Sequence, residues 1–334
     1  MTKFDRHDEP DPNLVQQAGE AYARLLDPDL VPEISWSSAE PLHRATSVVI
    51  PIEMRIGADH EVTLYFKSFH PARLTTETLD WWHTSFVDGV ERDLRLVPRF
   101  QRLAKPNGID VRQILAFDPE RLMLITLGVR GNPLGKVWKY AVGRAGREEA
   151  RVVFPKVGQA MKLLELASQG EDVPNDFITE GSIAVAAARL QMYLSASEAR
   201  DAESKVESLY VASQGQPGQR AYFAHGDIDA SNVLVDEGWV NLIDFAWVPR
   251  PIGFDISRFL LRMDLESPRI SKWTGQVSRL VVDGYGAEGV NDAPSYILVR
   301  VLKLIGLMHR FSTTRNRRRF TRVRALLRQT LSNT

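Results

Sequence analysis

The chain has 334 residues, 44% of them hydrophobic and 25% charged, and its 42 Lys and Arg residues balance its 42 Asp and Glu residues. This composition excludes a disordered chain and a membrane-embedded one, and the length suits two domains or one two-lobed domain with a cleft. The absence of cysteine excludes disulfides, thiolate zinc sites and cysteine nucleophiles.

The N-terminal residues, positions 1–13, are charged and contain no apolar core of a secretory signal, so we expect a cytoplasmic protein. The most apolar long stretch, positions 296–308, is interrupted by Arg300 and Lys303. It falls short of the roughly 20 residues that span a bilayer, so we expect no membrane span.

The first predicted elements are a short helix and a β-hairpin. Apolar residues at helical spacing predict an amphipathic helix over positions 14–26, which Pro28 ends. Positions 47–56 and 60–69 are rich in β-branched and aromatic residues and are joined by a turn that contains Gly57. They are predicted to be neighbouring antiparallel strands.

A long helix over positions 74–97 is predicted to pack on this sheet, ended or bent by Pro98. Its apolar residues recur every three or four positions on one face: Leu79, Trp82, Phe86, Val90, Leu94 and Val97. Positions 111–119 and 121–129 predict a second hairpin. The Gly- and Pro-rich segment that follows predicts a boundary between an N-terminal lobe, residues 1–130, and a C-terminal lobe, residues 131–334.

The C-terminal lobe is predicted to be mainly helical. Positions 148–167 and 182–212 have helical patterns, the second as one long exposed helix. Positions 223–248 predict a loop, a short strand, a turn, a second strand and a loop, and the chain is helical again from Asp255. Positions 301–334 hold nine Lys or Arg and no acid. They form either a basic helix on an acidic lobe, which we favour, or a contact for nucleic acid or anionic lipid.

The segment FAHGDIDASNVLVDEGWVNLIDFAWV, positions 223–248, places polar side chains between apolar strands. Phosphoryl transfer from ATP to a hydroxyl needs a carboxylate that accepts the proton of the alcohol, oxygen ligands for magnesium and a cation on the phosphates. Asp227 and Asn232 lie at the two ends of one loop, which positions 233–235 anchor to the core. Asp244 follows the next strand and therefore emerges beside Asn232, where both could share magnesium.

Other catalytic motifs are absent from the sequence. It contains no H-E-x-x-H, G-x-S-x-G or G-x-G-x-x-G pattern, which removes the signatures of zinc proteases, α/β-hydrolases and dinucleotide-binding folds. The segment GNPLGKV has its glycines one residue too close for a P-loop, and Val137 stands where Ser or Thr would bind magnesium.

The segments HGDIDASNVLV and LIDFAWVPRPIGFDISRFL resemble the aminoglycoside phosphotransferase and choline kinase group, relatives of the protein kinases. The resemblance implies an α+β, bilobal protein-kinase-like fold, with a small antiparallel sheet and one long helix in the first lobe and a larger, mainly helical second lobe. It implies Asp227 as catalytic base in a catalytic loop shared with His225 and Asn232, His225 being a structural partner. Asn232 and Asp244 would be the magnesium ligands. Asp255 matches an aspartate that supports this loop from a helix start, or it simply caps that helix.

The same resemblance implies a nucleotide site on the N-terminal lobe. Lys67 resembles the family lysine that contacts the α- and β-phosphates, with a surface lysine on an edge strand as the alternative. Its acidic partner would be Glu91 on the following helix, with Asp88 as second choice. Backbone groups around Thr126 and Leu127 would bind the adenine edge.

Three features depart from the family pattern or stay open. The segment WSSAEPLHRATS has no glycine, so a loop over the phosphates would use Ser37 and Ser38 or be shortened. Asp229 either binds an amino group of the acceptor or caps its own turn, which we favour. Three tryptophans could stack on a sugar, but core positions are favoured for them: Trp239, Trp247 and Trp273.

We therefore predict an enzyme that uses ATP and Mg²⁺ to phosphorylate a hydroxyl of a small molecule: a sugar, an amino sugar, an aminoglycoside-like antibiotic or an amino alcohol. The alternatives are a catalytically weak or inactive kinase-like scaffold that binds a nucleotide, and a nucleic-acid-associated protein that acts through the basic C-terminal segment. Retention of Asp227, Asn232 and Asp244 favours the enzyme over the scaffold.

Overall fold

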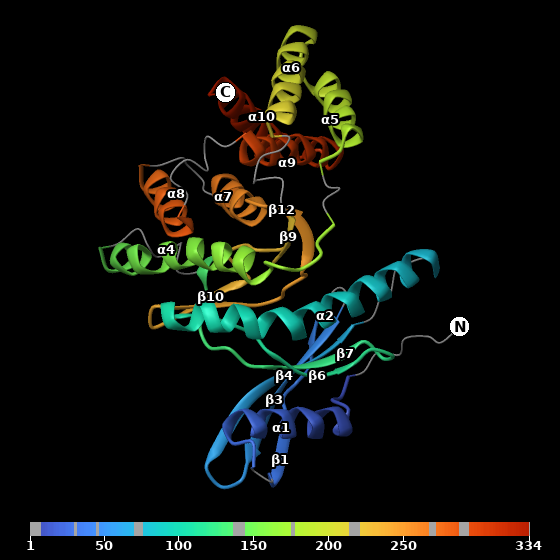
Figure 1. Ribbon diagram of the computed structural model, residues 1–334, viewed down its shortest axis with the longest axis vertical. Helices are drawn as coiled ribbons and strands as arrows, with labels where there is room; N and C mark the ends of the chain where they lie inside the picture. Colours follow the sequence, from blue (N-terminus) through green and yellow to red (C-terminus); the bar gives the residue numbers. More distant parts are fainter. Residues whose placement is uncertain are drawn as a thin grey trace. The chain divides into compact units, whose positions relative to one another are not determined.

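The computed structural model describes residues 8–29, 32–44, 47–69, 76–135, 144–174, 178–213, 221–266, 272–286 and 294–333. Contacts between residues divide the chain into two compact units, whose elements Figure 1 labels. The first unit comprises Met1–Gln101, Asp110–Gly131 and Asn241–Ile243. The second unit comprises Arg102–Ile109, Asn132–Val240 and Asp244–Thr334.

The first unit is built on an antiparallel sheet with the strand order β1-β3-β4-β7-β6, and the two-residue β2 pairs with β3. Its helices are α1 (Pro12–Leu26) and α2 (Thr76–Ala104), the last residues of α2 belonging to the second unit. Its strands are β1 (Ile34–Ser38), β2 (Leu42–His43), β3 (Ser47–Ile56), β4 (His60–Phe69), β6 (Ile114–Asp118) and β7 (Met123–Leu127). A 3₁₀ helix (Lys105–Asn107) and β5 (Ile109–Val111) follow α2.

The predicted first helix and both hairpins are confirmed. The carboxylate of Asp11 caps α1 by accepting the N–H groups of Asn13 and Leu14 at 2.9 and 3.1 Å. The apolar side of α1 packs on one face of the sheet, against β3, β6 and β7, in a core cluster that also contains Ile52 and Phe66. Strands β3 and β4 pair antiparallel over their full length, as do β6 and β7 apart from one bulge.

Helix α2 packs on the opposite face of the sheet, but not through all the predicted residues. Val90 lies in a cluster with Ile114 and Leu124, whereas Leu94 is 49% exposed. The buried stripe contains Val90, Asp93, Val97, Phe100 and Ala104. The prediction was wrong at position 94. It placed the apolar Leu94 on the buried face of the helix, whereas the acid Asp93 lies there. The helix also continues through Pro98 to Ala104.

The second unit consists of a long helix, two small groups of strands and a set of packed helices. Its helices are α4 (Arg144–Ala167), α5 (Glu180–Tyr193), α6 (Ala196–Ser213), α7 (Phe254–Glu266), α8 (Lys272–Tyr285), α9 (Pro294–Thr313) and α10 (Arg317–Ser332). Its strands are β8 (Asn132–Pro133), β9 (Ala221–Ala224), β10 (Val233–Asp236), β11 (Trp239–Leu242, of which the second half belongs to the first unit) and β12 (Val248–Pro251). Strand β10 lies between β8 and β11, and β9 pairs antiparallel with β12. In the described part of the chain no helix has the length and apolar character needed to cross a bilayer.

The single long helix predicted over 182–212 is wrong, because the chain breaks it into α5 and α6. Ser195 begins α6 with a capping box: its N–H donates to Glu198 Oε2 at 3.2 Å, and the N–H of Glu198 contacts Ser195 Oγ at 3.5 Å. The sequence S-A-S-E at 195–198 carries this start signal. The short strands β9 and β12, which frame the central segment, were not predicted either.

The basic C-terminal segment folds as α10 and packs on the helices of its own unit. Leu326, Leu327 and Leu331 belong to the same core cluster as residues of α5, α6 and α9. Two of its arginines reach an acid on α6: Arg324 Nη2 lies 3.0 Å from Glu198 Oε2, and Arg328 also pairs with Glu198. Hydrogen bonds from Ser195, with help from these arginines, lower the pKa of Glu198 to about 2. The favoured interpretation, a basic helix docked on an acidic partner, agrees with these contacts.

Glu165 is a buried carboxylate that joins α4 to α8 and to the start of α7. It accepts hydrogen bonds from Tyr285 Oη, from the N–H of Gly253 at 3.1 Å and from Lys162 Nζ at 2.9 Å. Burial raises the pKa of Glu165, and the hydrogen bonds from Tyr285 and Lys162 offset only part of this effect. Since Gly253 precedes the helix that carries Asp255, Glu165 helps to fix the segment behind the predicted catalytic loop.

The raised pKa of Glu165 gives a pH-dependent stability with a defined sign. A carboxyl whose pKa in the folded state exceeds its unfolded value near 4.5 stabilises the fold most below that value, and this contribution is lost as the pH rises through the folded pKa. We therefore expect the free energy of unfolding of the wild type, minus that of Glu165→Gln, to fall as the pH rises from about 4.5 towards neutrality. Urea denaturation at a series of pH values measures this difference. The exposed Glu149→Gln on the same helix is the control, and a difference that does not change with pH would contradict the assignment.

Candidate active site

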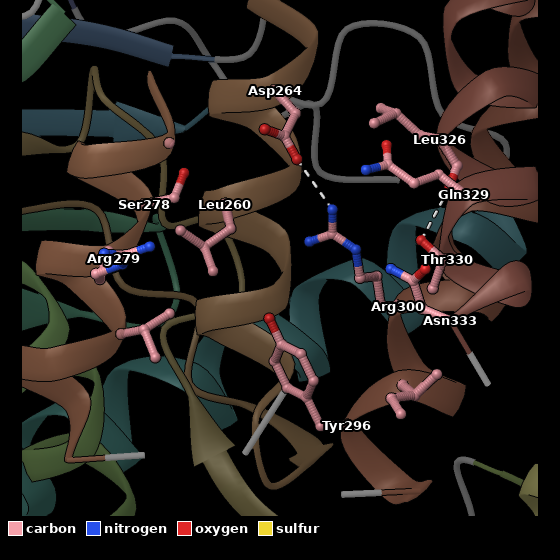
Figure 2. A pocket seen from close by; sticks show the side chains of 13 residues that line it. Leu260, Asp264, Ser278, Arg279, Tyr296, Arg300, Leu326, Gln329, Thr330 and Asn333 are labelled. Carbon is pink, nitrogen blue, oxygen red and sulfur yellow. Dashed lines mark hydrogen bonds and ion pairs between the residues drawn. The ribbon is translucent and has the colours of Figure 1, made fainter. Parts of the chain in front are cut away.

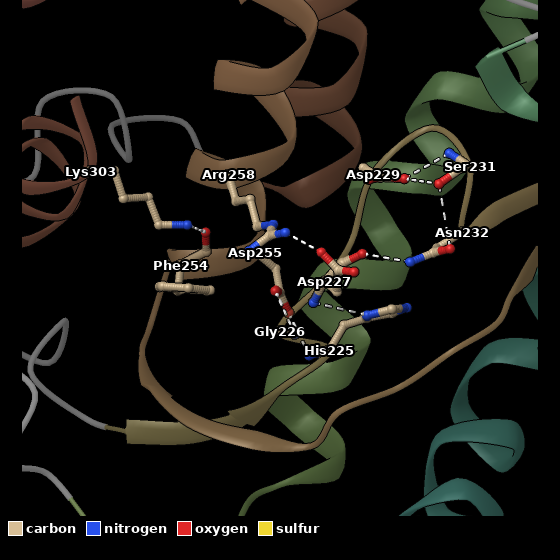
Figure 3. Close-up of polar contacts among 10 residues, drawn as sticks. All are labelled: His225, Gly226, Asp227, Asp229, Ser231, Asn232, Phe254, Asp255, Arg258 and Lys303. Atoms are coloured by element: carbon tan, nitrogen blue, oxygen red, sulfur yellow. Dashed lines mark hydrogen bonds and ion pairs between the residues drawn. The ribbon is translucent and has the colours of Figure 1, made fainter. Parts of the chain in front are cut away.

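The carboxylate of Asp255 forms hydrogen bonds with the backbone of the loop from His225 to Asn232. Asp255 is fully buried in the first turn of α7. Its Oδ2 accepts the N–H of His225 at 2.8 Å and its Oδ1 accepts the N–H of Gly226 at 3.2 Å (Figure 3). The predicted contact between Asp255 and the loop is therefore confirmed. The carboxylate bonds the loop, so capping of α7 is not its main role.

His225 and Gly226 shape the loop through packing and backbone conformation. The buried ring of His225 stacks on Phe245 with centroids 4.3 Å apart, and Phe245 stacks on the buried Trp247 at 4.8 Å. The N–H of Asp227 contacts His225 Nδ1 at 3.4 Å. Gly226 has φ +80°, and a Cβ there would collide with Val248, so only glycine fits. This geometry suits the supporting role predicted for His225.

Asp227 presents its side chain at the surface of the second unit, with 55% of it exposed. Its Oδ1 forms an ion pair with Arg258 of α7, and its backbone carbonyl accepts the Nδ2 of Asn232 at 2.9 Å. Figure 3 shows Arg258 and Asn232 reaching Asp227 from opposite sides. Because Arg258 takes Oδ1, the second carboxylate oxygen of Asp227 is the one placed to accept a proton. Arg258 was not predicted from the sequence.

Asn232 and Asp244 lie at the same end of a hairpin. Asn232 directly precedes β10 and Asp244 follows β11 two residues after its end. The two strands are neighbours and are joined by Glu237 and Gly238, both with positive φ (47° and 80°), as in a tight hairpin turn. Asp244 itself has φ +60°, a strained conformation for a residue other than glycine that recurs at functional sites.

The donor atoms of these two side chains suit magnesium. The Nδ2 of Asn232 donates to the backbone carbonyl of Asp227, so the Oδ1 of Asn232 points away from that hydrogen bond. Asp244 supplies a carboxylate. Amide and carboxylate oxygens are hard ligands of the kind that Mg²⁺ prefers. Among the described residues there is no group of three or more His, Cys, Asp or Glu side chains that could hold a metal ion. That Asn232 and Asp244 share an ion stays a prediction.

Lys67 lies in the middle of the sheet of the first unit, since β4 is flanked by β3 and β7. The edge-strand alternative for this lysine is therefore wrong. Its cross-strand neighbour is Leu124, and its Nζ is 5.5 Å from the ring of Phe69 on the same face. This is the face that α2 covers through Phe86 and Val90.

The predicted acidic partner of Lys67, Glu91, is exposed on α2. The second choice, Asp88, is paired with Arg92 at 3.4 Å. By contrast, Asp93 is only 3% exposed and follows Val90 by one helical turn on the face that packs on the sheet. A buried acid in a stripe of apolar residues at positions 90, 97, 100 and 104 was the sequence signal that the prediction overlooked.

The residues predicted to bind the adenine and to cover the phosphates lie in strands β7 and β1 of the first unit. Thr126 is buried in β7, and the N–H of Leu127 donates to Gln113 O at 2.8 Å, so that N–H already has an acceptor. Ser37 and Ser38 belong to β1 and pair with Glu53 and Ile52 of β3.

Two further alternatives are decided by the contacts. Asp229 caps its own turn: its Oδ1 accepts the N–H of Ser231 at 2.8 Å and the Oγ of Ser231 at 2.5 Å. Trp247 is buried as favoured, whereas Trp239 is 44% exposed, so the core prediction is wrong there. The side chain of Trp273 lies outside the described residues.

No family model and no curated protein matches the sequence. Solved structures do match. Aminoglycoside phosphotransferase APH(4)-Ia is similar with a TM-score of 0.54 at 12% identity, over 93% of this chain and 98% of that chain. The GDP complex of aminoglycoside 2'-phosphotransferase-IIIa matches with a TM-score of 0.50 at 14% identity, over 96% and 99%. A choline/ethanolamine kinase family protein from Mesorhizobium loti matches with a TM-score of 0.51 at 15% identity, over 95% and 97%.

Similarity at such low identity concerns the fold rather than the chemistry. The antiparallel sheet with its two helices in the first unit and the mainly helical second unit agree with the predicted fold class. The chain therefore has the protein-kinase-like fold shared by the aminoglycoside phosphotransferases and the choline/ethanolamine kinases.

Proposed function

We propose that the protein is a small-molecule kinase, which transfers the γ-phosphoryl group of ATP to a hydroxyl group with Asp227 as general base. The observation that carries the proposal is the construction of the catalytic loop. Asp255 accepts a hydrogen bond from the loop backbone, and Asn232, at the other end of the loop, donates to the carbonyl of Asp227. The carboxylate of Asp227 is partly exposed, so an acceptor could reach it. Solved structures of the same fold support nucleotide use, since they include complexes with GDP and with AMP-PNP.

In the proposed reaction, Asp227 accepts the proton of the acceptor hydroxyl as its oxygen bonds to the γ-phosphorus, and ADP leaves as the bridging P–O bond breaks. Asn232 and Asp244 would hold Mg²⁺, which supplies charge stabilisation at the phosphates. Lys67 would neutralise the α- and β-phosphates. We assign its supporting acid to Asp93 rather than Glu91, because Asp93 lies on the buried face of α2.

Two measurements test this function. Calorimetric titration with ATP and with GTP, each with and without magnesium, tests nucleotide binding. Release of ADP is then screened against sugars, amino sugars, aminoglycosides, amino alcohols and hydroxy acids. Solved structures of this fold include complexes with kanamycin and hygromycin B, so these two compounds belong in the screen. Magnesium-dependent ATP binding with acceptor-dependent ADP release supports the proposal, whereas binding without release over the whole panel would indicate an inactive scaffold.

Arg258 is expected to act as a positioning residue for Asp227. By pairing with Oδ1 it fixes the orientation of the carboxylate. We expect Arg258→Met to lower kcat about tenfold while the KM for ATP stays within about twofold, since a misoriented base loses part of its contribution. Arg258→Lys, which keeps the charge, should recover part of the loss. Equal changes in kcat and KM for ATP in both variants would contradict the positioning role.

A further inference from the structure

Helices α7, α8, α9 and α10 of the second unit line a cavity of about 520 Å³, which Figure 2 shows from close by. This volume lies in the range of roughly 300–1,000 Å³ that is usual for pockets that bind small molecules. The helices contribute residues three or four positions apart, such as Ser278 and Val282 of α8 and Gln329 and Asn333 of α10. Because such residues share one side of a helix, the cavity is bounded by one face of each helix.

The cavity is separate from the proposed active site. Arg258, which pairs with Asp227, does not line it. On α7 the cavity is lined by Leu260 and Asp264, which follow Arg258 by two and six positions. At about 3.6 residues per turn, these two residues lie on the side of the helix opposite Arg258. A molecule bound in the cavity would therefore leave the carboxylate of Asp227 accessible.

An ion pair between α7 and α9 forms part of the wall. Arg300 Nη2 lies 2.9 Å from Asp264 Oδ2, and the two side chains are 18% and 20% exposed (Figure 2). Within the described ranges of the chain, the other carboxylate oxygen of Asp264 accepts no hydrogen bond. The guanidinium has five N–H donors, of which this ion pair uses one. Two hydroxyls on adjacent carbons match this arrangement, because one can donate to the carboxylate while the other accepts from the guanidinium.

Uncharged polar side chains of α10 and α8 add further hydrogen-bonding groups. Figure 2 shows the amides of Gln329 and Asn333 directed toward Arg300, and Ser278 lines the side formed by α8. Amide groups and hydroxyls can each donate and accept, as the hydroxyls of a sugar do. The wall also contains apolar side chains such as Val282, which suit the C–H groups of a sugar ring. The lining therefore matches a molecule with several hydroxyls on a compact carbon skeleton.

A glycine in α8 leaves room in the cavity. Gly275 lines it, and a Cβ at this position would meet no atom within 4 Å. Gly284 of the same helix differs, because a Cβ there would collide with the backbone of Pro155 in α4. Glycine is unfavourable inside a helix, so a packing contact accounts for Gly284 but not for Gly275. The effect of Gly275 is to keep the wall of the cavity open.

The floor of the cavity contains a hydroxyl with unused hydrogen-bonding capacity. Tyr296 of α9 is 4% exposed, and its Oη has no hydrogen-bond partner of normal geometry among the described residues. Burial raises the pKa of Tyr296, and the nearby Arg300 and Ser257 oppose this effect. A buried hydroxyl without a partner is costly. A ligand hydroxyl that reached the floor would supply the partner.

We propose that this cavity is a second ligand site, which binds an uncharged sugar. Two adjacent hydroxyls of the sugar bind Asp264 and Arg300, and others bind the amides of Gln329 and Asn333. The ion pair is balanced in charge, so a neutral ligand needs no countercharge. Arg279, exposed at the margin of the cavity, adds a positive charge that disfavours an amino sugar. The site does not depend on the proposed phosphoryl transfer.

Calorimetric titration of the full chain tests this inference without turnover. The probes are glucose, galactose and mannose, each with its 2-amino-2-deoxy counterpart. We expect at least one neutral sugar to bind with a Kd of about 1 mM or lower, and its amino counterpart to bind more weakly. Asp264→Asn should weaken the binding roughly 10- to 100-fold, the usual effect of losing a hydrogen bond to a charged group. No binding by any of the three sugars, or equal or tighter binding of the amino counterpart, would overturn the inference.

Three further variants locate the bound sugar. Gly275→Phe should abolish binding by filling the cavity, and it should fold normally because the added side chain begins in open space. Asp201→Asn, at an exposed position of α6 outside the cavity, is the matched control for Asp264→Asn and should bind the sugar as the wild type does. Asp227→Asn should also keep the binding. A sugar that is lost in Asp227→Asn but retained in Asp264→Asn and Gly275→Phe would occupy the proposed active site, and the second site would be disproved.

Discussion

Asp227→Asn is expected to reduce turnover by roughly 10²- to 10⁴-fold, the usual contribution of a positioned general base. The amide keeps the size of the side chain and an oxygen that can accept the contact from Arg258, but it cannot take up the proton of the acceptor hydroxyl. Since the side chain of Asp227 is 55% exposed, the stability of the fold should change by less than about 0.5 kcal/mol. ADP release and urea denaturation measure the two quantities.

The control for this variant is Asp229→Asn, two positions along the same loop. The carboxylate of Asp229 bonds Ser231 and therefore serves the turn rather than the acceptor. It should leave turnover within a few fold of the wild type. If both variants lost activity equally, or if Asp227→Asn also abolished ATP binding, Asp227 would act in loop structure or nucleotide binding and the assignment as base would fail.

The geometry of the loop could be predicted because its polar residues are close together in sequence. Asp227, Asn232 and Asp244 are spaced by one loop and one hairpin, and alternating β-branched residues identify those strands. The support from Asp255 followed from the same motif. The ion pair of Asp227 with Arg258 could not be predicted, because Arg258 lies 31 positions away and nothing in its neighbourhood distinguishes it from a surface arginine.

The predictions of buried positions and of helix ends were wrong where a polar residue interrupts the apolar pattern. On α2 the buried stripe includes the acid Asp93, whereas the apolar pattern placed the exposed Leu94 on the packed face. That Glu91, which is exposed on the same helix, pairs with Lys67 stays a prediction. Between α5 and α6 the high helix propensity of the alanines concealed the capping box at Ser195. Polar residues at buried or helix-end positions therefore carried the information that periodicity missed.

Asp255→Asn is expected to destabilise the protein by about 3 kcal/mol, because it leaves a buried N–H group facing an amide nitrogen. The wild-type carboxylate accepts one N–H with each oxygen, at 2.8 Å from His225 and 3.2 Å from Gly226. An asparagine retains a single acceptor, so one of these two donors must lose its partner or the loop must shift. Urea denaturation measures the loss, with Asp264→Asn on the same helix as the control. Asp264 pairs with Arg300 in a more exposed place, at 20% side-chain exposure, and should cost about 1 kcal/mol or less.

The effect on activity decides whether Asp255 supports the loop or only the helix. The peptide groups of His225 and Gly226 lead directly to Asp227, so displacement of the loop moves the base. Turnover per folded molecule should therefore fall by at least tenfold at a temperature where Asp255→Asn is still folded, since small displacements of a base are costly. A variant that lost stability but kept wild-type turnover when folded would show that Asp255 stabilises α7 alone. The geometry of the loop around Asp227 would then depend on the stacking of His225 on Phe245 and on the hydrogen bond from Asn232 to the carbonyl of Asp227.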